Sequence, residues 1–150
     1  MLLVPFTVLA LALAQVQSPA HPQSPAQYRA RLETTKGPIV IEVHRDWAPN
    51  GADRFFELVT SGYYDDTRFF RVVQGRLEDL SATQDEQGFV PFGRVVSGME
   101  VADSLNSEYG DSAGGGIRAG QQEALFDGGN AYLDRDFPRL DRIIQARILP

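Results

Sequence analysis

Alternation of apolar and polar side chains indicates where the folded part of this chain begins. Residues 28–35 alternate strictly, and after a Lys36-Gly37 turn the run Pro38 to His44 has strand character again. A period of two indicates β-strands, and a short turn between two such runs indicates a hairpin. The apolar row of the first run is Tyr28, Ala30, Leu32 and Thr34. We therefore expect a domain that starts near Tyr28 with a hairpin.

A helical period follows the hairpin. Ala52, Phe55, Phe56 and Val59 recur at intervals of three and four, which places them on one apolar helix face. Pro49 suits the first helical turn, and Gly62 suits a position just past a helix end. The pattern predicts a helix over Pro49–Ser61.

The rest of the chain predicts further strands and a second, short helix. Apolar runs predict strands at Phe69–Val73, Val90–Val96 and Arg142–Leu149, and Met99–Asn106 predicts the helix. In the first of these strands Phe69 and Arg71 share a face, and in the last Ile143 and Gln145 alternate with Ile144 and Ala146. The glycine-rich run Ser107–Asn130 predicts a long loop.

The first residues indicate an export signal. Residues 1–14 are almost wholly apolar, are too few to span a bilayer, and end in the small-x-small pattern Ala12-Leu13-Ala14. Residues 15–27 are rich in Pro, Ser, Gln and Ala, as in a linker. The alternative is a buried first element of the domain. We expect cleavage before Gln15 and a protein that is periplasmic or extracellular and leaves the membrane.

Composition narrows the classes of function. The chain has 150 residues, which suits one domain over residues 28–150, and a formal net charge of -6. That charge argues against binding nucleic acid or an anionic membrane. The chain has no cysteine, which excludes disulfides and thiolate chemistry.

Several motifs resemble the cyclophilin-type peptidyl-prolyl isomerases. They are E-T-T-K-G-P-I-V-I-E-V, the helix A-P-N-G-A-D-R-F-F-E-L-V, the run R-F-F-R-V-V and the later run F-G-R-V-V-S-G-M-E-V-A-D. The stretch G-N-A-Y-L-D-R-D-F-P-R-L-D resembles a secreted bacterial branch of the family. The resemblance implies a closed antiparallel β-barrel capped by two helices, with proline-containing peptides or unfolded proteins as substrates and no cofactor.

The resemblance also assigns site residues. Arg71 matches the family's catalytic arginine, which hydrogen-bonds to the prolyl amide as it twists. Phe70 stands where the family often has a histidine, and Phe89 stands about where a pocket histidine can occur. We expect both to contact substrate. The alternatives are an Arg71 paired with an acid on a strand, and phenylalanines, including Phe69 and Phe92, that belong to the core.

The centre of the family's domain is absent from this sequence. Only 12 residues, 76–87, separate the two central motifs, and the pocket phenylalanine and glutamine of the family are not among them. We therefore expect a mainly β fold with two helices, a barrel left incomplete by a deletion near residues 75–87. Open edges of such a barrel favour self-association.

No metal site is expected. His21 and His44 are far apart and have no cysteine near them, and the acidic residues Asp134, Asp136 and Asp141 lack the spacing of a calcium loop, which favours a solvated turn. Two functions stay open: an exported prolyl isomerase, weak or inactive because of the missing centre, and a non-catalytic cyclophilin-like binding module or remnant.

Overall fold

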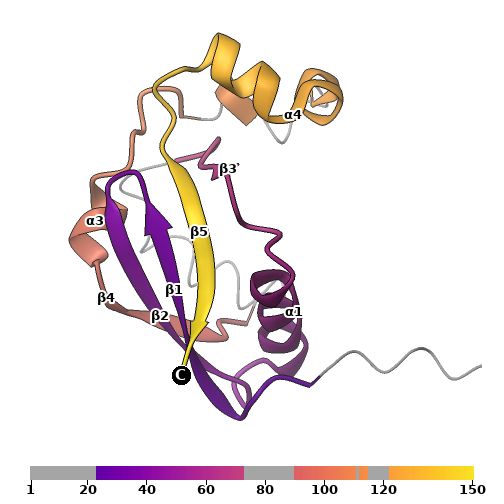
Figure 1. Cartoon of the computed structure of the whole chain (residues 1–150), viewed down its shortest axis with the longest axis vertical. Coiled ribbons are helices and arrows are strands. Elements are labelled where there is room, and N and C mark those ends of the chain that lie inside the picture. The colour runs from indigo at the N-terminus through magenta and orange to yellow at the C-terminus, as the bar shows by residue number, and fades with distance from the viewer. Residues whose placement is uncertain (1–22, 73–89, 111, 115–121) are drawn as a thin grey trace, which may run out of the picture.

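The computed structural model describes residues 23–72, 90–110, 112–114 and 122–150, which form an antiparallel sheet with helices around it (Figure 1). Helix α1 lies beside one end of the sheet and α4 lies beyond the other end. In chain order the elements are β1 (Gln27–Thr34), β2 (Gly37–His44), α1 (Pro49–Thr60), β3 (Thr67–Arg68), β4 (Gly93–Ser97), α3 (Met99–Asp103), the 3-10 turn η1 (Ser112–Gly114), α4 (Glu123–Asp136) and β5 (Arg142–Leu149).

The sheet is built around the predicted hairpin. Its strand order is β3-β5-β1-β2-β4, so the first and last strands of the domain are neighbours. In the hairpin Thr34 pairs with Gly37, and the Thr34 hydroxyl donates to the Gly37 carbonyl at 2.6 Å. The φ of +130° at Gly37 is one that glycine adopts without strain. The expected hairpin is confirmed.

One face of the sheet forms the core with α1. The apolar row predicted for β1 is buried on this face, where it meets Val59 of α1 and Ile143 and Ala146 of β5. Tyr28 packs beside Ala52 and donates its hydroxyl hydrogen to the Ala52 carbonyl at 2.6 Å. Burying one side chain of valine size contributes about 1.5–3 kcal/mol. The expected helix is confirmed and ends at Thr60.

The folded part begins before Tyr28. Strand β1 starts at Gln27, and Ser24 is buried, with its backbone N–H and hydroxyl donating to Asp53 Oδ1 at 2.9 and 2.7 Å. Arg45 binds both oxygens of the same carboxylate and, with Ser24, holds the pKa of Asp53 well below its usual range. The end of the expected 15–27 linker is thus attached to α1. The expected signal at residues 1–14 lies outside the described residues.

The strand predicted over Phe69–Val73 is wrong for the described residues 69–72. The strand here is β3, only Thr67–Arg68, which pairs with the start of β5. The Phe69 N–H still donates to the Asp141 carbonyl at 2.8 Å, and beyond it the chain leaves the sheet. Residues 69–72 have the apolar composition of a strand, but β5 begins at Arg142, so among the described residues no strand continues alongside them.

Gly98 marks the boundary between the next strand and the next helix. Strand β4 is Gly93–Ser97, shifted from the predicted Val90–Val96, and α3 ends at Asp103 rather than Asn106. Gly98 joins them with a φ of +84°, and a Cβ there would lie 2.2 Å from the Pro38 carbonyl oxygen. Only glycine fits this approach, so the strand ends there. Met99, the first residue of α3, is 45% exposed.

The long loop predicted over Ser107–Asn130 is wrong in its second half. Helix α4 occupies Glu123–Asp136, and η1 lies within the same predicted loop. Gly129 adopts φ +50° and ψ −138°, which kinks the helix without ending it. The glycine content of the run indicated a loop, whereas helical turns lie on both sides of the kink at Gly129.

Strand β5 has the predicted bounds but not the predicted alternation. Both Ile143 and Ala146 are buried, whereas Ile144 is 54% exposed. The register against β1 shifts between Glu33 and Thr34, so Ile144 is an extra residue in a β-bulge. The bulge moves the inward positions by one residue.

The sheet of the described residues is not closed, and its outer strands are β3 and β4. This is the mainly β, antiparallel architecture that was expected, with helices beside it. None of the described helices has the length and apolar character needed to cross a membrane.

Candidate functional site

Arg71 lies just beyond the short edge strand β3. Phe69, two residues before it, packs against the core of the sheet, as the alternative interpretation of the phenylalanines expected. Phe70 is half-buried and Arg71 is exposed. The Phe69–Asp141 backbone bond is the last sheet contact before Arg71. The exposed arginine therefore stands close to a fixed point of the sheet.

A buried arginine, Arg68, fixes that point, and no local sequence pattern indicates its role. The Arg68 side chain is 4% exposed and donates to both oxygens of Asp134 on α4, at 2.9 and 2.7 Å. Arg68 also pairs with Asp66 at 2.7 Å and holds the pKa of that carboxyl below its usual range. The two carboxylates and the bidentate geometry offset the desolvation cost of burying the Arg68 guanidinium. Arg68 thus joins β3 to α4, three residues before Arg71.

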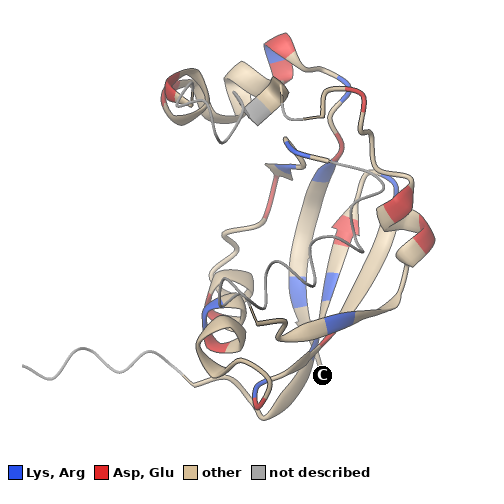
Figure 2. Cartoon of the chain, turned by 180° about the vertical axis from the view of Figure 1, so that it is seen from behind, with Lys and Arg blue, Asp and Glu red and all other residues tan. Residues whose placement is uncertain are grey.

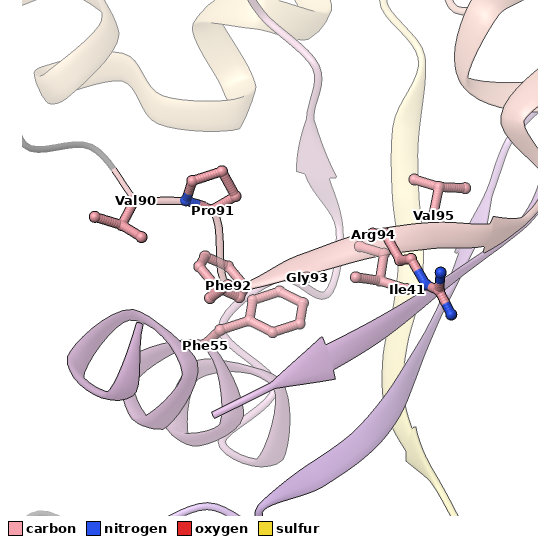
Figure 3. A pocket seen from close by; sticks show the side chains of 8 residues that line it. All are labelled: Ile41, Phe55, Val90, Pro91, Phe92, Gly93, Arg94 and Val95. Atoms are coloured by element: carbon pink, nitrogen blue, oxygen red, sulfur yellow. The ribbon is translucent and has the colours of Figure 1, made fainter. Parts of the chain in front are cut away.

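An apolar pocket lies at the other edge of the sheet, where the chain enters β4 (Figure 3). It has a volume of about 450 Å³ and is lined by Ile41, Phe55, Val90, Pro91, Phe92, Gly93, Arg94 and Val95. The rings of Phe55 and Phe92 are 5.4 Å apart at 39°, which gives the pocket an aromatic floor. Phe92 also packs against the core, so it serves both the interior and the pocket wall.

The structure brings Arg71 and this pocket to different edges of the sheet. The pocket is built on α1, β2 and the segment that leads into β4, whereas Arg71 follows β3. Among the described lining residues neither Arg71 nor Phe70 occurs. The two edge strands are separated by β5, β1 and β2, which is four spacings of about 4.8 Å along the sheet. Phe89, the third predicted site residue, lies outside the described residues.

A charged cluster occupies the other face of the sheet. Glu42 on β2 has a side chain only 6% exposed, and it accepts from Arg29 at 3.0 Å and Arg94 at 2.8 Å. His44 lies 3.2 Å from the same carboxylate and stacks on Trp47 with centroids 4.2 Å apart. The bonds from Arg94, Arg29 and His44 lower the pKa of Glu42 to about 2. The carboxylate is saturated with donors, which makes the cluster a structural ion-pair network.

The expected solvated acidic turn is wrong for Asp141, whereas Asp134 and Asp136 are exposed but lie in α4 rather than in a turn. Asp141 is buried, accepts from the Thr35 hydroxyl at 2.7 Å and from the Asn106 N–H at 2.7 Å, and so holds the hairpin turn to the end of α3. Asp134 binds Arg68. These carboxylates have protein partners. Across the described part of the chain no group of three or more potential ligands could hold a metal ion.

Comparison with known proteins points to one family. The family model of cyclophilin type peptidyl-prolyl cis-trans isomerase/CLD matches residues 29–79. Peptidyl-prolyl isomerase CWC27 of Yarrowia lipolytica is 42% identical over 68 residues, 45% of this chain and 18% of that protein. Peptidyl-prolyl cis-trans isomerase cypE of Dictyostelium discoideum is 30% identical over 102 residues, 68% of this chain and 63% of that protein.

A mammalian relative is also named as a peptidyl-prolyl isomerase. Peptidyl-prolyl cis-trans isomerase-like 1 of Mus musculus is 32% identical over 88 residues, 59% of this chain and 51% of that protein. This chain therefore spans less than two thirds of the length of each of these three relatives. The matched segment 29–79 contains the hairpin, α1, β3 and Arg71. The family match and the relatives show that this chain is similar to cyclophilin-type domains, most clearly over residues 29–79.

Proposed function

We propose that this chain recognises proline-containing segments of proteins and isomerises prolyl bonds weakly or not at all. The observation that carries the proposal is the separation of Arg71 from the apolar pocket, which lie at opposite edges of the described sheet. Arg71 supplies the donor that the family's chemistry needs, and the pocket supplies an apolar surface. Rapid isomerisation needs both at one prolyl residue.

Catalysis of prolyl rotation requires the donor and the ring-binding surface at the same residue. Rotation about the amide must overcome a barrier of about 18–20 kcal/mol, because resonance is lost as the bond twists. A hydrogen bond to the twisted amide favours the transition state only while the ring is held still. An exposed arginine gains less from such a bond than a shielded one, since water competes for the amide.

Binding without catalysis is the second candidate, and the pocket favours it. A volume of about 450 Å³ lies within the range of about 300–1,000 Å³ that is common for ligand sites. Its walls are aliphatic and aromatic side chains with one arginine, Arg94, at the rim. A pyrrolidine ring fits that chemistry. On this alternative the chain would hold proline-containing segments without accelerating their rotation.

The proposed place of action is outside the cytoplasm. The apolar residues 1–14, the small-x-small site at Ala12 to Ala14 and the Pro/Ser/Gln-rich residues that follow support export to a periplasmic or extracellular space. There the protein would act on exported proteins during folding. N-terminal sequencing of the exported material should give a chain that begins near Gln15, and a chain that keeps Met1 in the cytosol would rule the proposal out.

A paired isomerase and binding experiment tests the function. The chain, its Arg71→Ala variant and an Arg54→Ala variant are compared on a short X-Pro peptide, because Arg54 is an exposed arginine on α1 away from β3. We expect weak or absent activity, and any that remains should be lost only with Arg71→Ala. High activity in the unmodified chain, or equal loss in both variants, would contradict the proposal.

The same peptide separates the two candidates. Val95 lines the pocket and is 37% exposed, so a Val95→Ser change should weaken peptide binding without unfolding the sheet. Binding that depends on Val95, with no isomerisation, supports the non-catalytic module. Isomerisation that depends on Arg71 supports the enzyme, and the absence of binding in every variant would remove both.

A further inference from the structure

The outer face of the sheet is basic although the chain as a whole is acidic. Residues paired directly across two strands share a face, so the pairs of Arg29 with Glu42, Glu42 with Arg94 and Arg31 with Arg147 all lie opposite the core. Figure 2 shows the blue bands of Lys and Arg on neighbouring strands. The face carries Arg29, Arg31, Arg94 and Arg147 against Glu33 and Glu42, in a chain of net charge -6.

Two of these arginines face each other without an acid between them. Arg31 on β1 and Arg147 on β5 are direct cross-strand partners, and like charges in such a pair are destabilising. Arg31 contacts Glu33 at 2.5 Å, on its own strand. Arg147 donates to the neutral side-chain oxygen of Gln145. Arg31 thus has a carboxylate partner, whereas the described contact of Arg147 is with a neutral amide, so a further negative charge beside the two arginines would offset their repulsion.

A cavity lies where that charge is needed. It has a volume of about 260 Å³ and is lined by Arg31, Glu33, Arg147 and Leu149. We propose that this cavity binds the side-chain carboxylate of an acidic, extended segment of a partner protein. The two guanidinium groups provide planar donors that match a carboxylate, and Leu149 provides an apolar wall for the residue next to the acid.

Charge selects a carboxylate rather than a phosphate. Two arginines and one glutamate leave a net charge of +1 in the cavity, which a single carboxylate neutralises. A phosphate dianion exceeds this charge and lies against Glu33. A nucleic acid meets the same glutamate together with the net charge of -6, which opposes its approach over a longer range.

The spacing of the face favours acids at alternate positions. Arg29 and Arg31 are two residues apart on β1, a distance of about 6.8 Å in an extended strand. Side chains on one face of an extended peptide repeat at the same interval. The Arg29–Glu42–Arg94 group also has one more arginine than acid, so a second carboxylate two residues along the peptide meets a second positive site.

Titration with a defined peptide tests the proposal. The probe is acetyl-Leu-Glu-Leu-Glu-Leu-amide, with the same peptide carrying Gln for Glu and inorganic phosphate as the comparison ligands, at low salt. Arg147→Gln should weaken binding of the acidic peptide by about fivefold, as expected for the loss of one exposed ion pair. Glu33→Gln should strengthen it by a similar factor, because it removes the acid that competes for Arg31.

The opposite directions of these two changes keep the test independent of folding defects. Arg54→Gln and Glu57→Gln are the matched controls, since they make the same charge changes in an ion pair on α1, 2.7 Å long, and should leave the affinity unchanged. Equal binding of the Gln peptide, tighter binding of phosphate, or equal effects of the control variants would overturn the proposal. Prolyl isomerase activity has no part in this readout.

Discussion

Individual charged residues in this chain have been placed by tertiary contacts that a sequence pattern cannot show. Glu42 sits in the polar row of β2, yet its side chain is 6% exposed because arginines from both neighbouring strands cover it. Arg68 and Arg71 flank the same two phenylalanines, and one is buried while the other is exposed. The family resemblance selected Arg71 from its motif, whereas nothing local indicated that Arg68 would find Asp134, 66 residues away.

The Glu42 network predicts an acid-dependent loss of stability. The folded-state pKa of Glu42, about 2, lies below its ordinary value of 4.5, so its stabilising effect is complete above about pH 4.5 and is lost as the pH falls toward 2. Urea unfolding from pH 7 to pH 2 should show a steeper decline for the wild type than for Glu42→Gln. The variant should be less stable at pH 7. Parallel pH profiles would show that the network does not stabilise the fold.

At the scale of elements, strong local periodicity was enough for the hairpin and α1, each of which buries a row of apolar side chains at a regular spacing. Every boundary of these elements and of β5 was predicted within one residue, although the bulge in β5 breaks its predicted alternation. The misses were elements whose existence depends on distant partners. Strand β3 is short because β5 starts at Arg142, and α4 is a kinked helix anchored by Arg68.

The Arg68 anchor should control the docking of α4. Arg68→Ala removes two bonds to Asp134 and the pairing with Asp66, and should lower the free energy of unfolding by about 1–3 kcal/mol. Hydrogen exchange should increase selectively in α4 and β3. Arg135→Ala is the control, because Arg135 lies on α4 but pairs only locally with Asp136. Equal exchange in the two variants would show that α4 is held in another way.

For the molecule as a whole, the decisive feature is a sheet that is open in its described part. Strands β3 and β4 lie at its two edges, and β4 carries the exposed side chains of Val95 and Val96. Exposed edges invite pairing with another chain. The resemblance predicted a closed barrel for the family and a barrel opened by the short central segment for this chain. The described residues form an open antiparallel sheet, and the incomplete barrel stays a prediction from sequence.

Self-association through β4 is the expected consequence. Sedimentation velocity over a wide concentration range should show oligomers that a Val96→Lys change reduces, because a charge on an edge strand disfavours pairing. Ile144→Lys is the matched control, since Ile144 is an exposed apolar residue on an interior strand. A strict monomer with a cooperative melting transition above about 65 °C would contradict the expectation.

We propose that Arg71 is a competent catalytic arginine that lacks a complete proline pocket beside it. The most direct measurement is kcat/KM on an X-Pro peptide after residues 76–87 are replaced by the central segment of a full-length cyclophilin, with and without Arg71→Ala. We expect kcat/KM to rise at least about tenfold, equivalent to about 1.4 kcal/mol of transition-state stabilisation, and we expect Arg71→Ala to abolish this rise. No gain, or a gain that survives Arg71→Ala, would contradict it.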